Sequence, residues 1–126
     1  MLEKSKAFGS FAVNDLDHAK HFYGHILGLN VTDNPMGILE LHITGNQPTI
    51  IYPKPDHQPA TFTILNFPVK NLEKTVDALI IKGVTFEQYT GQIQTNEKGI
   101  SKSKHSPHIA WFKDPAGNIL SLIEEG

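Results

Sequence analysis

Apolar and polar residues alternate along short stretches of this chain, and in two longer stretches the apolar residues recur every three to four positions. Alternation predicts strands with one buried face, and the longer period predicts amphipathic helices. The first alternating stretch, residues 7–13, places Phe11 and Val13 on one face. Its other face carries Phe8, Ser10 and Ala12. We therefore expect a short strand at the start of the fold.

A helix is predicted next, because Asn14 and Asp15 offer a cap and Gly28 can end it. Its apolar face has helical spacing: Leu16, Ala19, Phe22, Tyr23, Ile26 and Leu27. Three strands are expected after it, over residues 29–32, 37–43 and 49–53. In the middle one, the alternation sets Leu39, Leu41 and Ile43 against Ile38, Glu40 and His42. If the leucines pack on the helix, Glu40 and His42 lie on the opposite face.

Residues 53–59 hold three prolines in the sequence PKPDHQP and predict a linker, since proline cannot pair inside a sheet. Beyond the linker the pattern starts again. A strand over 62–69 precedes a helix that Asn71 caps and Gly83 ends, with its apolar face formed by Leu72, Val76, Leu79 and Ile80. A strand over 84–89 follows. The sequence DPAGN at 114–118 then predicts a turn between the two strands of a final hairpin, which spans residues 109–123.

The two halves repeat at the level of single residues. Four residues recur at one constant offset: Phe11, Val13, Asp15 and Leu16 return as Phe67, Val69, Asn71 and Leu72. This predicts an α+β fold of two βαβββ modules within one domain, residues 1–126. Module one covers 5–55, the linker 53–59 and module two 60–125. Because neither half buries both faces alone, we expect the two sheets to join around a shared cleft.

Residues 90–107, between the predicted strand at 84–89 and the final hairpin, are polar, contain glycine and are rich in lysine. A mobile surface loop is the first interpretation of such a segment. The functional alternative is a lid over the cleft.

Composition narrows the chemistry. The 126 residues include no cysteine, which excludes thiol catalysis, disulfides and cysteine-ligated zinc. All eleven cationic side chains are lysine and the formal charge is −2, so the chain lacks the arginine forks and basic blocks typical of nucleic-acid binding. No apolar run approaches the length of a membrane span. We expect a cytoplasmic protein without nucleic-acid or membrane partners.

Three stretches resemble one known family: FAVNDLDHAKHFYGHILGLNV, FPVKNLEKTVDALIIKGVTF and WFKDPAGNILSLIEE. Together they are similar to the vicinal oxygen chelate superfamily, which includes glyoxalase I, the bleomycin-resistance proteins and the extradiol dioxygenases. The resemblance spans nearly the whole chain. It implies paired βαβββ modules that form a cup-shaped mixed sheet, assembled as a homodimer.

In metal-using members of that superfamily, His, Gln or Glu side chains from the first and last strands of each module hold one divalent ion. Matching the motifs puts these positions at Phe8, Ile64 and Ser121, with the fourth near Tyr52. Hydrocarbon side chains provide no lone pair, and a serine hydroxyl is a poor ligand for such an ion. We therefore expect no metal at these positions and no cofactor.

Two groups of histidines offer other chemistry. Glu40 and His42 form a possible general-base pair, with Tyr52 as a third catalytic candidate, or they orient a polar ligand. The alternative is a solvated strand face. His18, His21 and His25 follow one helix flank, where we expect them to be solvated, although His21 and His25 are spaced to hold an ion.

Alternation also predicts the lining of a ligand cavity: Phe8, Ser10, Ala12, Ile50, Tyr52, Phe62, Ile64, Asn66, Ile119, Ser121 and Ile123. Such an apolar surface with a few hydroxyl and amide groups suits a small amphipathic or aromatic molecule. His108 is expected at the mouth of the cleft or at an exposed strand end. Trp111 is expected to stack on a ligand, close a dimer or fill the core. The alternative is that Phe8 and Ile64 meet and fill the cavity.

Three functions follow from these residues. The preferred hypothesis is a metal-free protein that binds a small organic molecule in the cleft between the modules, as a sequestering or accessory protein. The second is a lyase, isomerase or dioxygenase that uses Glu40, His42 and Tyr52 or a non-standard metal site. The third is a dimeric interaction module whose cavity is filled.

Overall fold

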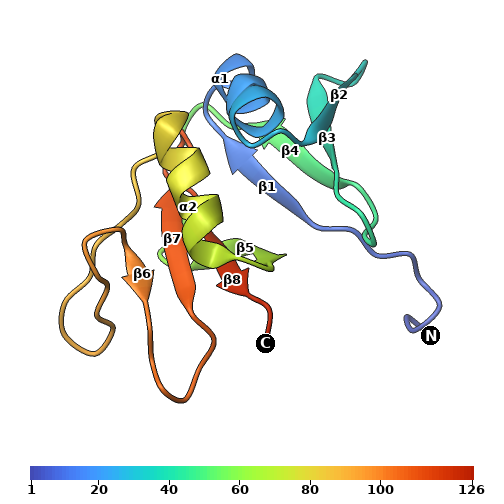
Figure 1. Cartoon of the computed structure of the whole chain (residues 1–126). Coiled ribbons are helices and arrows are strands. Elements are labelled where there is room, and N and C mark those ends of the chain that lie inside the picture. Colours follow the sequence, from blue (N-terminus) through green and yellow to red (C-terminus); the bar gives the residue numbers. More distant parts are fainter. The chain divides into compact units, whose positions relative to one another are not determined.

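The structure is a computed structural model that describes all 126 residues, and the chain forms two compact units, Met1–Gln58 and Pro59–Gly126 (Figure 1). Each unit contains one four-stranded mixed sheet and helical segments. The predicted α+β class is thereby confirmed. No helix has the length and apolar character needed to cross a membrane.

The first unit contains six elements in the predicted order. They are β1 (Ser10–Val13), α1 (Leu16–Lys20), η1 (His21–Ile26), β2 (Asn30–Asn34), β3 (Ile38–His42) and β4 (Thr49–Pro53). The strand order is β1-β4-β3-β2. β1 pairs parallel with β4, and the other two pairs are antiparallel. The parallel pair closes the unit because the chain crosses from β1 to the far edge of the sheet before it returns.

The helical segment begins at Asp15, whose carboxylate accepts a hydrogen bond from the backbone amide of His18 at 3.0 Å. After Lys20 it widens into the π-helix η1, in which the amide of Leu27 donates to the carbonyl of Phe22, five residues earlier, at 2.9 Å. Gly28, at φ 74°, ends it as predicted. The single helix expected from the sequence is therefore two segments with different hydrogen bonding.

The core of the first unit lies between these helical segments and one face of the sheet. Its buried side chains are Val13, Ala19, Phe22, Tyr23, Leu39, Leu41 and Ile51. The ring of Tyr23 meets Phe22 edge-on at 5.2 Å and lies 5.7 Å from the ring of Phe11. Helices this short are unstable alone in water. Burial of large apolar side chains, at about 1.5–3 kcal/mol each, is what holds them.

The second unit repeats the plan with five elements: β5 (Thr63–Val69), α2 (Leu72–Ile81), β6 (Ile100–Ser101), β7 (Ile109–Lys113) and β8 (Ile119–Glu124). The strand order is β5-β8-β7-β6, with β5 parallel to β8. Helix α2 begins at Asn71, whose side chain accepts from the amide of Lys74, and it packs on β7 and β8. Leu72 and Val76 are buried there, whereas Ile80 is exposed, so the predicted apolar face was too wide.

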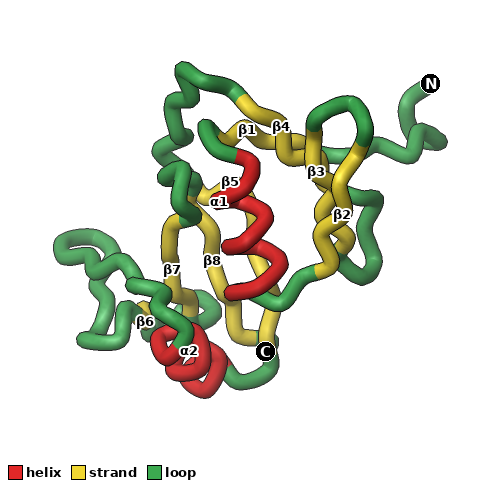
Figure 2. The backbone as a smooth tube through the Cα atoms, turned by 90° about the horizontal axis from the view of Figure 1, so that it is seen from above, coloured by secondary structure: helices red, strands yellow, loops and turns green.

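The prediction of a strand over 84–89 is wrong. Only Phe86 forms a bridge, to Phe112, and Glu87 donates one backbone bond to Trp111. The partner strand β6 comes instead from Ile100–Ser101, inside the segment that was expected to be loop (Figure 2). Asn96 creates this arrangement, because its side-chain oxygen accepts from the amides of Lys98 and Ile100 and turns the chain back toward β7.

The final hairpin is confirmed. Asp114 is buried at its turn, where one carboxylate oxygen accepts from the amides of Ala116 and Asn118, both at 2.9 Å. The other oxygen accepts from the side-chain amide of Asn118. Gly117, at φ 89°, completes the turn. The hairpin places Ala110 and Phe112 of β7 and Leu120 and Leu122 of β8 on the face that carries the apolar core, and Trp111 and Ser121 on the other.

Candidate ligand-binding site

One face of the second unit's sheet carries a row of three candidate ligand-binding side chains. Strand register aligns Asn66 of β5 with Ser121 of β8, and Ser121 with Trp111 of β7. Ser121 is fully buried, and its hydroxyl donates to the side-chain oxygen of Asn66 at 2.5 Å. Side chains opposite one another in a sheet share a face. Three candidates that lie far apart in the sequence are therefore neighbours.

A hollow of about 640 Å³, which we call the aromatic hollow, lies beside Trp111 in the same unit. The residues that give it its character are Phe62, Tyr89, Thr90, Ile93, Trp111 and Ile119. The rings of Tyr89 and Trp111 meet edge-on with centroids 5.5 Å apart. Phe62 is 67% exposed and Ile93 is 48% exposed. Large apolar side chains left exposed around one concavity are typical of a surface that binds a small molecule or another protein.

The phenol of Tyr89 is neutral at pH 7, and its surroundings favour this form further. Burial raises the pKa of the Tyr89 phenol above 10.0, the Glu87 carboxylate raises this pKa further, and the Lys113 ammonium opposes both. Glu87 and Lys113 themselves form an ion pair at 3.5 Å. At neutral pH the wall of the hollow therefore presents a phenol hydroxyl, which can donate or accept one hydrogen bond.

Trp111 and Ile119 line the hollow, as does Phe62 from the predicted cavity set. Asn66 and Ser121 lie in the strand row beside Trp111. Ile64 falls at the register irregularity of β5, between Thr63 and Leu65. The sequence interpretation missed Tyr89, Thr90 and Ile93. The only signal in the sequence for these residues was an aromatic and an aliphatic residue at the edge of a polar segment. The wrongly predicted strand over 84–89 assigned Tyr89 to a sheet and left the others in a surface loop.

His108 lies apart from this row. Its Nδ1 is 3.6 Å from a carboxylate oxygen of Glu124, and the other oxygen of Glu124 accepts from the backbone amide of Leu72 at 2.8 Å. Glu124 therefore joins the start of β7 to the start of α2. This is a structural arrangement at the helix N-terminus, where a carboxylate is favoured by the helix dipole.

The first unit places Glu40 and His42 on one face of β3, opposite the buried Leu39 and Leu41, as predicted. Each is hydrogen-bonded to a side chain of β2. The Asn34 amide donates to Glu40 at 2.9 Å, and the Thr32 hydroxyl lies 2.9 Å from His42 Nε2. The carboxylate and the imidazole are thus positioned by β2 and form no hydrogen bond with each other.

The remaining candidates of this unit are more exposed. Register aligns Ser10 with Ile50, and Ile50 with Glu40, in one row across three strands. Tyr52 is 38% exposed on β4, and Phe8 precedes β1 and is 65% exposed. Ser10, Glu40 and Tyr52 therefore belong to the sheet face, whereas Phe8 belongs to the segment that leads into it.

The residues at the metal positions implied by the resemblance do not fit a divalent ion. Phe8 and Ile64 are hydrocarbon, Tyr52 offers only a phenol, and the hydroxyl of Ser121 is already bonded to Asn66. No three His, Asp or Glu side chains gather anywhere in the chain in a way that would hold an ion.

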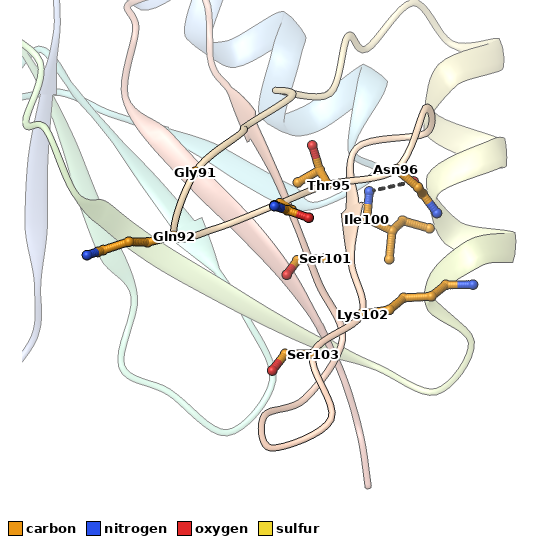
Figure 3. Close-up of a pocket in the computed structure, with 9 residues that line it drawn as sticks. Gly91, Gln92, Thr95, Asn96, Ile100, Ser101, Lys102 and Ser103 are labelled. Atoms are coloured by element: carbon orange, nitrogen blue, oxygen red, sulfur yellow. Dashed lines mark hydrogen bonds between the residues drawn. The ribbon is translucent and has the colours of Figure 1, made fainter.

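A second hollow of the second unit, about 460 Å³, is polar (Figure 3). Thr95 and Asn96 on its wall already bond the backbone, to Tyr89 and to Lys98 and Ile100. In Figure 3, Lys102 extends away from Ser101 and Ser103, and Gln92 points outward on the other side. The polar groups do not converge on one point, so the aromatic hollow is the better candidate for binding.

Comparison with known proteins gives the fold a family. The chain resembles three solved structures among others. One is a candidate glyoxalase-family protein of Bacillus anthracis (TM-score 0.73, 19% identity, 94% of this chain and 93% of that chain). It also resembles the fosfomycin resistance protein FosX of Listeria monocytogenes (0.71, 13%, 95% and 92%). The third is TnmS3, an antibiotic binding protein of a Streptomyces species (0.68, 20%, 95% and 96%).

At these identities the likeness establishes the fold alone. No curated protein sequence matches the chain. The family model described as Glyoxalase/Bleomycin resistance protein/Dioxygenase superfamily matches residues 7–122, which cover most of both units and every strand and helix up to Leu122 of β8. The chain therefore belongs to the Glyoxalase/Bleomycin resistance protein/Dioxygenase superfamily.

Proposed function

We propose that this protein binds a small organic molecule with a flat apolar part in the aromatic hollow of the second unit, without a metal ion at the superfamily's ligand positions. The observation that carries the proposal is the 640 Å³ hollow beside Trp111, with Tyr89, Phe62 and Ile93 around it. Ligand sites for small molecules measure about 300–1,000 Å³ and are lined mainly by apolar and aromatic side chains with a few polar groups.

The aromatic side chains supply the affinity. Tyr89 and Trp111 meet edge-on, so each offers part of a ring face or edge to a planar ligand. An aromatic pair contributes about 0.5–1.5 kcal/mol beyond the burial of its area. The neutral phenol of Tyr89 and the hydroxyls of Thr63 and Thr90 supply hydrogen bonds that fix the ligand's orientation. The result is a site suited to amphipathic rather than strongly charged molecules.

One relative supports binding as the activity to test first, and a second is a drug-resistance protein of the same fold. TnmS3 is an antibiotic binding protein, and FosX is a fosfomycin resistance protein. We therefore propose a sequestering or accessory role and include antibiotics among the ligands to be screened, together with planar aromatic compounds. We also propose that the protein acts as a homodimer, as the resemblance implies; light scattering after gel filtration distinguishes a dimer from a monomer.

The single tryptophan makes the proposal directly testable. Trp111 is the only tryptophan of the chain, so any ligand in the hollow changes the intrinsic fluorescence of one residue. We expect saturable quenching or a spectral shift with at least one compound of the screen, and a matching rise in Tm. Trp111→Leu should abolish the Tm rise, whereas the control Met36→Ala, an exposed apolar side chain of the other unit, should leave it intact.

Screens that leave both fluorescence and Tm unchanged would contradict the proposal and favour the interaction-module hypothesis. The proposal is also contradicted if a compound raises the Tm of Trp111→Leu and of the wild type equally. In that case the ligand binds elsewhere and the aromatic hollow has no part in it.

The enzyme hypothesis depends on a different observation, the shared face of Glu40 and His42 and their separate hydrogen bonds to Asn34 and Thr32. This geometry holds a carboxylate and an imidazole in fixed orientations, as a general acid or base requires. Turnover of a glutathione hemithioacetal or a catechol by wild-type protein, lost in both Glu40→Gln and His42→Gln, would establish catalysis. Turnover that survives in both variants would exclude these residues as its source.

A further inference from the structure

We propose that His21 and His25 form a surface site for a divalent first-row transition ion, with Cu²⁺ bound more tightly than Ni²⁺ or Zn²⁺. The two histidines are four residues apart on the outer side of the π-helix η1. The site uses none of the residues of the aromatic hollow. It also uses none of the superfamily's metal positions. The inference is therefore independent of the proposed function.

The geometry of the pair carries the proposal. The two imidazole rings lie 5.0 Å apart between centroids, with their planes only 22° from parallel. Both residues are exposed. Two histidines four positions apart on one helical face hold a metal ion together. Because stacked rings hold their in-plane nitrogen lone pairs in nearly parallel planes, each ring must turn about its side-chain torsions before a nitrogen of each points to one ion, and the exposure of both side chains leaves room for that turn.

The backbone under the pair is unusual and well anchored. Residues His21–Ile26 form a single π-helical stretch, a rare conformation that is found frequently at functional sites. Phe22 and Tyr23, next to His21 on the opposite side, are buried in the core of the first unit. The amide of Leu27 bonds the carbonyl of Phe22, and the amide of Leu29 bonds that of Tyr23. The histidines therefore project from a fixed support.

The chemical state of the pair suits a metal. Neither ring takes part in any hydrogen bond or ion pair within the protein, so the ring nitrogens are available. The adjacent cation, Lys20, is paired with the carboxylate of Asp33, which offsets its repulsion of an incoming ion. The nearest other imidazole, His18, is held beside Asp15 at 3.6 Å. No third ligand joins the pair, so water completes the coordination and the ion remains exchangeable.

The imidazole ligands determine that the site prefers copper, nickel and zinc. Imidazole suits these ions, and for nitrogen ligands the affinity rises to a maximum at Cu²⁺. Binding requires neutral rings and is therefore weakened by acid. Mg²⁺ and Ca²⁺ prefer oxygen ligands and are not expected to compete.

The test uses untagged, chelator-washed full-length protein and isothermal titration with Cu²⁺ and Ni²⁺ at neutral pH. We expect one ion per chain at the pair. His21→Gln and His25→Gln should each weaken binding by roughly tenfold or more, because two ligands on one support bind far better than either alone. The matched control is His18→Gln on the same helix, which should keep wild-type affinity. In NMR spectra, Cu²⁺ should broaden the signals of residues 20–26 first.

Circular dichroism and Tm without metal establish that each variant is folded, and solvent-exposed substitutions should change the Tm little. Equal affinity of wild type, His21→Gln and His25→Gln would overturn the proposal. A loss in His18→Gln as large as that in His21→Gln would do the same, since it would mean that the helix collects ions through all its histidines without a defined pair.

Discussion

Ser121 and Asn66 are joined by a 2.5 Å hydrogen bond across the parallel pair β5 and β8, the first and last strands of the second unit. Their burial is unequal, since Ser121 is fully buried and Asn66 is exposed. The hydroxyl therefore depends on the amide for its partner, whereas the amide also reaches water. The same bond occupies the hydroxyl at a position where metal-using relatives are expected to present a ligand.

The unequal burial of Ser121 and Asn66 predicts which of two substitutions lowers the free energy of unfolding more. Asn66→Ala should cost about 1–3 kcal/mol, because it leaves a buried hydroxyl without a partner. Ser121→Ala should cost only about 0.5–1.5 kcal/mol, because the amide of Asn66 is then hydrated. Urea unfolding of both variants measures the difference. A larger loss for Ser121→Ala would mean that the hydroxyl has a second partner.

Gly99 is required where the chain turns into β6. It has φ 82°, and a Cβ atom there would lie 2.7 Å from the Cβ of Phe86 and 3.0 Å from the carbonyl oxygen of Glu87. Gly99→Ala should therefore cost more than the roughly 1–2 kcal/mol of the left-handed backbone alone. Gly91→Ala is the matched control, since its φ is 101° but nothing lies within 4 Å of the added atom. Equal losses of stability in the two variants would refute the steric argument.

The buried carboxylate of Asp114 holds the turn of the final hairpin through three accepted hydrogen bonds. Asp114→Ala should lower the free energy of unfolding by roughly 2–4 kcal/mol, because charged acceptors make the stronger bonds and two buried donors of Asn118 lose their partner. Asp114→Asn keeps one acceptor oxygen and should lose less. Thermal unfolding compares them, with exposed Asp56→Ala as the control, expected to stay near wild type.

Tyr89 should report its environment in alkaline titration. Its pKa is raised from 10.0, chiefly by burial and then by Glu87. The folded state thus favours the protonated phenol, so this contribution to stability is complete below the unfolded pKa of about 10 and is lost as pH rises through the folded value. The absorbance difference between wild type and Tyr89→Phe should titrate above pH 10. A midpoint at or below that value would show that the phenol is hydrated.

Much of the fold could be predicted because the signals are local. The Asp15 and Asn71 caps, the turn at 114–118 and the alternation in β3 each depend on a few neighbouring residues. The π-helical form of η1 could not be predicted, since the apolar spacing from Leu16 to Leu27 suits an ordinary helix and hydrogen bonds from Leu27 and Leu29 decide the outcome. The prediction of a strand over residues 84–89 failed for a related reason. These residues have β propensity, but the strand that pairs with β7 at this edge of the sheet is β6.

The candidate site divides in the same way. By itself the sequence determined the resemblance to the family, the face of the last strand on which Ser121 lies, and the lack of ligating side chains at Phe8 and Ile64, because these depend on residue identity and on a period of two. Only the tertiary structure decided that Tyr89 packs against Trp111, that Ile93 lines the same hollow, and that Asn66 satisfies Ser121. Such contacts depend on strand register and on the path of a long connection, and no local propensity encodes either.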